Sequence, residues 1–285
     1  VVLLAVEGES VDGIVRDNLV ESNENIGIVV SASFDGTFAT GTISGNKVTK
    51  SGTDGIFCFA HGTGDAGSPG NGICDPVLDG NFVNFNAGDG YHCKTQRTAS
   101  CGGLLQNNQF LANGGQGIGR EHVNNFVIGS APLLINNIIA HNEGGGAEFL
   151  TGDQPLFVNN TLAFNGPLGI HGGLPTIVNS IIWGHTDDLD VPVGQVAHSD
   201  VGEPGYASFN NNLSVDPLFV AVAQNDFHLL PESPLINVGN SAYPELPATD
   251  FEGDPRLWIT LVDIGADEFI GPLQQQLLPV IPVEN

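Results

Sequence analysis

Apolar residues recur at fixed distances from a repeated asparagine. Three positions before this asparagine, and again two positions after it, every repeat carries an apolar side chain. The first column reads Val15, Ile43, Leu78, Leu105, Leu134, Phe157 and Ile177; the second reads Val20, Val48, Val83, Phe110, Ile139, Leu162 and Ile182. A third column follows a glycine, as in Ile28, Ile56 and Ile118. The pattern predicts three short strands per repeat, each with one side facing inward.

The repeated polar residue is the second half of this pattern. It reads Asn18, Asn46, Asn81, Asn108, Asn137 and Asn160, with Ser180 in the seventh place. A unit of roughly 20 to 35 residues that returns to the same strands is typical of a solenoid, in which each coil packs only on its neighbours. We therefore expect three parallel sheets and an asparagine ladder, in which side-chain amides at a bend hydrogen-bond along the stack.

Composition and charge narrow the functions open to such a solenoid. The chain has 285 residues, 39 of them glycine, and its net charge is −25. A surface this acidic repels phosphate backbones and anionic lipid headgroups, so we expect no nucleic-acid partner. No apolar run approaches the roughly 20 residues that cross a bilayer, so we expect no membrane insertion.

The repeats resemble the right-handed parallel β-helix of the pectin-lyase-like superfamily over roughly residues 11–200. The resemblance implies an all-β solenoid of about seven to nine coils over residues 1–200. Beyond it, short motifs such as Asp250 to Arg256 and Val262 to Phe269 resemble the closing segment of bacterial secreted or surface-anchored β-helix proteins. We therefore divide the rest into terminal coils with a C-terminal cap, residues 201–270, and an extended tail, residues 271–285.

Four cysteines fall into two columns of the repeat. Cys58 and Cys93 lie twelve residues after their asparagines, and Cys74 and Cys101 lie seven residues before theirs. Neighbouring coils are about 4.8 Å apart, within the Cα spacing of a disulfide. We therefore predict the bridges Cys58–Cys93 and Cys74–Cys101, with zinc ligation as the alternative. Disulfides imply an oxidising compartment, hence an extracellular or cell-surface location.

The resemblance places any active site on the outward positions of the strand after each glycine. The middle coils gather ionisable residues there: His92, Lys94, Glu121 and Glu148, with Arg97 and Arg120 nearby. A polysaccharide lyase could use Lys94 as base and Arg97 or Arg120 to neutralise a substrate carboxylate, with calcium as cofactor. Two alternatives remain open. Lys94 and Glu121 could form an ordinary cross-strand ion pair, and Glu121 with Glu148 could serve an inverting glycosidase.

Two sequons permit N-glycosylation, at Asn159 and Asn212, and Asn212 is the better candidate because Asn159 adjoins the ladder. The metal ligands, if any, are not identified by the sequence.

The favoured interpretation is a non-catalytic extracellular or cell-surface β-helix with a structural, matrix or adhesive role, whose partners are extracellular polysaccharide or further copies of itself added head to tail. The alternative is a calcium-dependent lyase acting on an acidic glycan. A third interpretation is carbohydrate binding without turnover, with Phe57 and Phe59 as a stacking surface.

Overall fold

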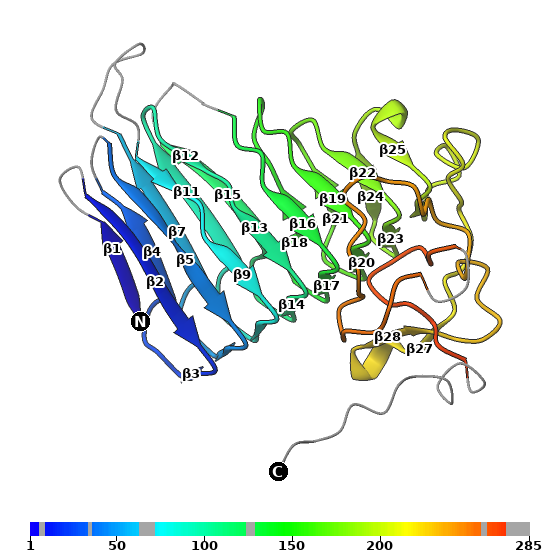
Figure 1. Cartoon of the computed structure of the whole chain (residues 1–285), viewed down its shortest axis with the longest axis horizontal. Coiled ribbons are helices and arrows are strands. Elements are labelled where there is room, and N and C mark those ends of the chain that lie inside the picture. The colour runs from blue at the N-terminus through cyan, green and yellow to red at the C-terminus, as the bar shows by residue number, and fades with distance from the viewer. Residues whose placement is uncertain (6–8, 34–35, 63–71, 124–128, 258–260, 272–285) are drawn as a thin grey trace.

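The protein is a parallel β-helix in the computed structural model, which describes residues 1–5, 9–33, 36–62, 72–123, 129–257 and 261–271. The backbone coils through three parallel sheets, A, B and C, that run along the long axis of the molecule (Figure 1). The predicted fold class, a right-handed parallel β-helix with three sheets, is confirmed. Most of the proposed tail, residues 272–285, lies outside the described residues.

Sheet A contains β1 (Val2–Ala5), β4 (Ile28–Ala32), β7 (Ile56–His61), β11 (Tyr91–Gln96), β15 (Gln116–Val123), β18 (Gly145–Glu148), β21 (Leu168–His171) and β24 (Asp187–Asp190). Sheet B contains β2 (Ser10–Arg16), β5 (Phe38–Ser44), β8 (Ile73–Cys74), β9 (Val77–Asp79), β12 (Ser100–Cys101), β13 (Leu104–Gln106), β16 (Leu133–Ile135), β19 (Leu156–Val158), β22 (Thr176–Val178) and β25 (Val196–Ala197). Sheet C contains β3 (Leu19–Glu21), β6 (Lys47–Thr49), β10 (Phe82–Asn84), β14 (Gln109–Leu111), β17 (Ile138–Ala140), β20 (Thr161–Ala163), β23 (Ile181–Trp183) and β26 (Asp200–Val201). An antiparallel pair, β27 (Phe219–Ala221) and β28 (Asp226–Leu229), and the short 3₁₀ helices η1 (Val193–Gln195) and η2 (Val222–Gln224) complete the elements.

The inward columns form the core of the solenoid. In sheet C the central residues of successive strands pair in register, from Val20 through Phe110 to Val201. All of them are buried. Burying an aliphatic or aromatic side chain of this size contributes about 1.5–3 kcal/mol, so stacking in register provides the main driving force for coiling.

The predicted asparagine ladder is confirmed. The main-chain and side-chain amides of Asn46 both donate to Oδ1 of Asn81, at 3.0 Å each, and its side chain also donates to the carbonyl of Val15 at 2.8 Å. The same contacts join the six predicted asparagines in turn and continue through Ser180 and Ser199 to Asn212. The ladder therefore pairs the polar groups that each bend between sheets B and C would otherwise bury unsatisfied.

A second ladder runs along the bend between sheets C and A. It passes through Asn86, Asn113, Asn142 and Asn165, each accepting from the rung before it, and ends on His185. His185 is buried and binds Oδ1 of Asp188 through Nδ1 at 2.7 Å. In the middle coils, two of the three bends are thus fixed by side-chain amides.

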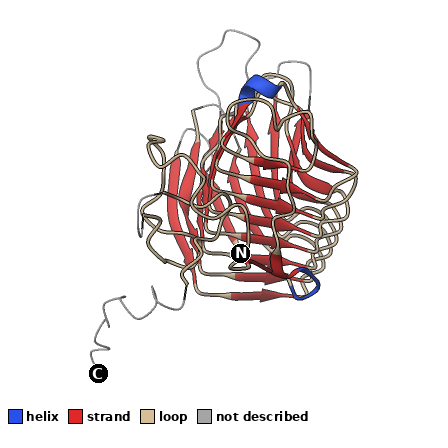
Figure 2. Cartoon of the chain, turned by 90° about the vertical axis from the view of Figure 1, so that its right-hand side faces the viewer, coloured by secondary structure: helices blue, strands red, loops and turns tan. Residues whose placement is uncertain are grey.

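The C-terminal part of the chain covers two different surfaces of the solenoid. Residues 203–213 close the end of the solenoid: Glu203 accepts from the main-chain amides of Asp188 and Leu189, and Leu213 pairs with Val201. Figure 2 looks onto this end, where turns lie in front of the stacked strands. These contacts pair several main-chain groups at the C-terminal end of the solenoid, and the head-to-tail strand addition that the sequence suggested stays a prediction.

Residues 219–257 and 261–269 instead lie along the side of the solenoid, over the outer face of sheet C (Figure 1). That face is apolar here because Leu111, Ile138, Ala140 and Ala163 point outward and pack against Phe227 and its neighbours. A row of asparagines with positive φ, at Asn136, Asn159 and Asn179, holds the segment by donating to its carbonyls. We call residues 219–269 the strap.

The predicted disulfide pairing is wrong, although all four cysteines are oxidised. The bonds are Cys58–Cys74 and Cys93–Cys101, with Cα atoms 6.1 and 6.3 Å apart. The predicted partners do lie in register on neighbouring strands. Their side chains project in parallel, however, so their Cβ atoms keep the spacing of about 4.8 Å, longer than the 3.5–4.5 Å of a disulfide. Inward side chains of sheets A and B converge within one coil, and they form the bonds.

Neither predicted glycosylation site is accessible in the fold. Asn159 is fully buried and its amide donates to the strap, whereas Asn212 is 3% exposed and ends the ladder by donating to Val196. Among the described residues, no helix has the length and apolar character to span a membrane.

We expect Asn108→Ala to lower the free energy of unfolding by about 2–4 kcal/mol, because it leaves buried amides of Asn81 and the carbonyl of Leu78 without partners. Urea unfolding followed by circular dichroism measures the change. Gln109→Ala, on the half-exposed outward face of β14, is the control and should cost about 0.5 kcal/mol or less. Equal losses for the two variants would contradict the ladder's role.

We expect digestion with trypsin and Asp-N protease without reduction to yield peptides that link Cys58 to Cys74 and Cys93 to Cys101, since Asp65 and Arg97 separate the partners of each bond. Mass spectrometry before and after reduction identifies them. A peptide linking Cys58 to Cys93 would contradict the pairing.

Candidate functional site

The candidate site lies on the outer face of sheet A in the middle coils. Strand alternation in β11 turns Tyr91, Cys93 and Thr95 into the core and leaves His92 and Lys94 outside. Parallel pairing sets Lys94 beside Glu121 of β15 and His92 beside Gly119. The next pairing continues the column through Glu148 to His171. The sequence columns therefore place four of the predicted residues, His92, Lys94, Glu121 and Glu148, on one face.

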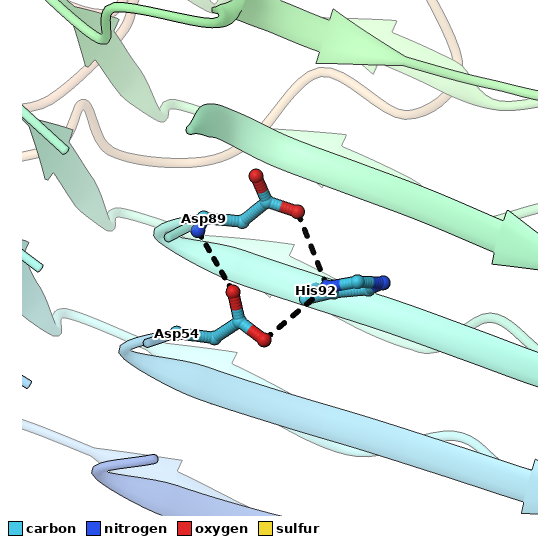
Figure 3. Close-up of side chains that lie close together, drawn as sticks. All are labelled: Asp54, Asp89 and His92. Atoms are coloured by element: carbon cyan, nitrogen blue, oxygen red, sulfur yellow. Dashed lines mark hydrogen bonds and ion pairs between the residues drawn. The ribbon is translucent and has the colours of Figure 1, made fainter. Parts of the chain in front are cut away.

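His92 sits between two aspartates that the sequence reading missed (Figure 3). Its Nδ1 is 3.2 Å from Oδ2 of Asp54 and 3.3 Å from Oδ2 of Asp89. All three side chains are at least four-fifths buried. A signal for them existed in the sequence, because Asp54 and Asp89 each precede the glycine of their repeat, at Gly55 and Gly90.

The two aspartates also fix the backbone. Oδ1 of Asp54 accepts from the amide of Asp89 at 2.8 Å, and Oδ1 of Asp89 accepts from the amide of Gln116 at 2.7 Å. The carboxylate of Asp89 can occupy this position only because Gly119 lacks a side chain. A Cβ at residue 119 would lie 1.9 Å from Oδ2 of Asp89. One oxygen of each aspartate is thus committed to the fold, and the other faces His92.

Burial and charge shift the pKa values in this cluster. Burial raises the pKa of Asp89 to about 6, against the opposing effects of the Gln116 amide and His92. Burial alone would lower the pKa of His92, but the hydrogen bond to Asp54 and the charges of Asp89, Asp54 and Glu121 outweigh it and raise this pKa above its usual value. The cluster therefore favours a protonated His92 held between carboxylates.

Lys94 and Glu121 form the ion pair that was the alternative to catalysis. Nζ of Lys94 is 2.7 Å from Oε2 of Glu121, which is also 3.7 Å from Nε2 of His92. Glu148 lies one coil further, where its Oε2 accepts from the side-chain amide of Gln116 at 3.5 Å. An open groove of about 370 Å³ is lined by Asp89, His92, Gln116, Arg120, Glu121 and Glu148.

Of the two predicted arginines, Arg120 lines this groove but turns its charged group into the core, and Arg97 is not among the lining residues. Arg120 occupies the inward column beside Cys93, where its side chain is 3% exposed and lies 3.2 Å from Asp153. It also donates to Thr95 and Ser130. Arg120 therefore neutralises a buried aspartate, which argues against its predicted role in neutralising a substrate carboxylate. Arg97 follows β11 in a left-handed turn and is exposed.

An aromatic row lies next to the groove on the same face. Phe57, Phe59 and His61 alternate outward along β7, half-buried, with neighbouring ring centroids 6.2 and 6.4 Å apart and planes within 14°. The edge of Phe57 meets His92, with centroids 5.3 Å apart. On the outer face of sheet A, the aromatic side chains of β7 thus lie directly beside the charged groove that begins at β11.

Asp54, Asp89 and His92 could hold a metal ion, because their ligand atoms lie within 4.8 Å of one another. Calcium takes six to eight oxygen ligands, and this group offers two free carboxylate oxygens and an imidazole nitrogen. The donor set fits the predicted calcium poorly and suits a borderline transition metal better.

Comparison with known proteins does not identify a family for this chain. No protein-family model matches the chain, and a search of curated proteins finds no relative. Among solved structures, the chain is similar to the crystal structure of pectate lyase Pel9A, with 13% identity over 88% of this chain and 72% of that chain and a TM-score of 0.48. A similarity this weak carries no argument about activity or substrate, and the fold rests on the strand pairing and ladders of the chain itself.

We expect Gly119→Ala to destabilise the fold by about 1–3 kcal/mol, because the new methyl group overlaps the carboxylate of Asp89 and forces it away from His92. Thermal and urea unfolding measure this. The control is Gly194→Ala, where no atom lies within 4 Å of the added Cβ and stability should change by about 0.5 kcal/mol or less. Identical stability of the two variants would contradict the close packing of the Asp89 carboxylate against Gly119.

Proposed function

We propose that this protein is an extracellular β-helix, with a matrix or adhesive role, that binds a neutral polysaccharide along the outer face of sheet A without cleaving it. The observation that carries the proposal is the aromatic row of Phe57, Phe59 and His61 beside the polar groove of His92, Glu121 and Glu148. Sugar rings have apolar faces and hydroxyl edges. A surface that offers flat rings and hydrogen-bond acceptors side by side suits both.

The charges in the groove favour binding over catalysis. A lyase that acts on a uronate needs a free base and a cation to neutralise the substrate carboxylate. Lys94 is held by Glu121, and Arg120 is turned into the core toward Asp153. Each of these positive groups, and His92 between Asp54 and Asp89, is thus already paired with a carboxylate, which disfavours such an elimination.

The same charges favour a neutral glycan over an acidic one. Asp89, Glu121 and Glu148 line the groove, and the chain as a whole has a net charge of −25. A polyanion would approach this face against an unfavourable field. Two disulfides support an oxidising compartment, consistent with a polysaccharide partner outside the cell.

A second candidate function is a metal-dependent polysaccharide lyase. The observation in its favour is that Asp54, Asp89 and His92 could hold a cation within the same groove as Lys94. A cation held by these three residues would supply the positive charge that a substrate carboxylate needs, with Lys94 as the nearby base.

We expect affinity electrophoresis and calorimetry with soluble glucans, xylans, mannans and uronates to detect binding of a neutral glycan. The double variant Phe57→Ala/Phe59→Ala should weaken that binding about tenfold or more, since loss of stacking worth about 1.4 kcal/mol changes affinity tenfold. The control is Phe38→Ala, which removes a 43% exposed phenylalanine from sheet B and should leave affinity unchanged.

Equal binding by the double variant and the control would contradict the proposed face. Ultraviolet-absorbing unsaturated products from a uronate, formed with added Ca²⁺, Mn²⁺ or Zn²⁺ and abolished by Lys94→Ala, would replace the proposal with the lyase. Absence of product with every uronate and metal would rule the lyase out.

A further inference from the structure

The strap buries far more negative than positive charge where it meets the solenoid. Arg256 is fully buried, and Asp250, Asp263, Asp267 and Glu268 around it are each at most 6% exposed. Nη1 of Arg256 is 3.6 Å from Oε2 of Glu268. Within the described part of the cluster, one guanidinium thus faces four carboxyl groups.

These carboxyl groups hold the loops of the strap together. Oδ1 of Asp250 accepts from three successive main-chain amides, those of residues 252–254, and its Oδ2 accepts from Glu268. Asp263 accepts from the amides of Asn237 and Phe269. Repulsion within the cluster therefore acts directly on the hydrogen bonds that shape the strap.

Arg256 also joins the strap to the solenoid. It donates to Oδ1 of Asn136 at 2.6 Å, and Asn136 donates to the carbonyl of Thr249 at 2.8 Å. His141, Asn159, Thr161 and Asn179 make further polar contacts to the strap. The main-chain carbonyl of Asn179 also accepts from the amide of Gly265, but none of these contacts involves a ladder asparagine. The strap can leave without breaking the stack of coils.

We propose that the strap is a pH-controlled element, docked on sheet C in mildly acidic solution and released in mildly alkaline solution while the solenoid stays folded. Release would uncover the apolar outer face formed by Leu111, Ile138, Ala140 and Ala163. The proposal concerns sheet C and is independent of glycan binding on sheet A.

The sign of the effect follows from the carboxyl groups. Burial raises the pKa of Glu268 to about 8 and the pKa values of Asp263 and Asp267 to about 6. A carboxyl group whose pKa is raised by folding stabilises the folded state below its unfolded pKa, and this contribution is lost as the pH rises through the folded pKa. Docking therefore weakens across the window from about pH 4 to about pH 8.

The other charged groups around the cluster do not reverse this sign. His228 lies 4.0 Å from Asp267; burial opposes its protonation, but hydrogen bonds to Glu252 and Asp226 raise its pKa to about 9, so it stays charged across the window. Burial and the charges of Asp250 and Glu252 raise the pKa of Asp254 as well. On the solenoid side, the neutral Asn136 and Asn159 contact the cluster. Among the described residues of the solenoid, the titratable group that contacts the strap is His141, which lies against Val222 and Phe227 rather than against the carboxyl groups.

Trp183 reports release directly, because it packs half-buried against the strap cluster of Leu229, Leu235 and Ile264. The second tryptophan, Trp258, lies outside the described residues and is replaced in a Trp258→Phe background. We expect the fluorescence of Trp183 to shift to the red between pH 5 and pH 9, with a midpoint between about 6 and 8, while far-ultraviolet circular dichroism retains its β signal.

Glu268→Gln tests the cause, because glutamine keeps the acceptor for the Asp263 amide and cannot ionise. We expect its release midpoint to rise by about one pH unit or more. Glu245→Gln, the same change at an exposed position of the strap, should leave the midpoint unchanged. If Glu268→Gln does not fold, Asp267→Asn takes its place.

Three results would overturn the proposal: no change at Trp183 up to pH 9, loss of the circular dichroism signal at the same pH as the fluorescence change, or equal midpoints for the Glu268 and Glu245 variants.

Discussion

The structure depends on pairing the backbone where the chain bends. A strand can satisfy its amides with the neighbouring coil, but each corner of the solenoid buries polar groups that no strand partner reaches. The side-chain amides of Asn46, Asn81 and their equivalents fill this need, since one amide both accepts from the coil before and donates to the coil after. The hydrogen bonds at these bends fix the position of each coil relative to the next, so the apolar columns stack in register.

Much of the fold could be predicted because one-dimensional spacing and three-dimensional stacking coincide in a solenoid. The inward columns, the ladder and the cysteine columns all follow from counting residues from Asn18 onward. The disulfide partners did not follow. The residue spacing shows which coil Cys58 belongs to and which strand residue it pairs with. The direction in which its side chain leaves the strand decides that it bonds to Cys74 and not to Cys93.

The candidate site was predicted in part for the same reason. Alternation along β11 and β15 was enough to bring Lys94 to Glu121, and it should also have assigned Arg120 to the inside. Asp54 and Asp89 were missed because they lie in turns, outside the strand columns. The strap was missed because Ile138, Ala140 and Ala163 were not recognised as a second apolar face, although a solvent-facing strand would carry polar residues there.

The first ladder also gives the molecule a direction. Every rung from Asn18 to Ser199 donates its main-chain amide toward the C-terminal neighbour, and every rung after Asn18 accepts from the N-terminal one. The row is thus a one-way chain of aligned dipoles, in which each bond polarises the next and strengthens it. A single folded chain therefore has two chemically unlike ends, in the way that a polar filament does, before it meets any partner.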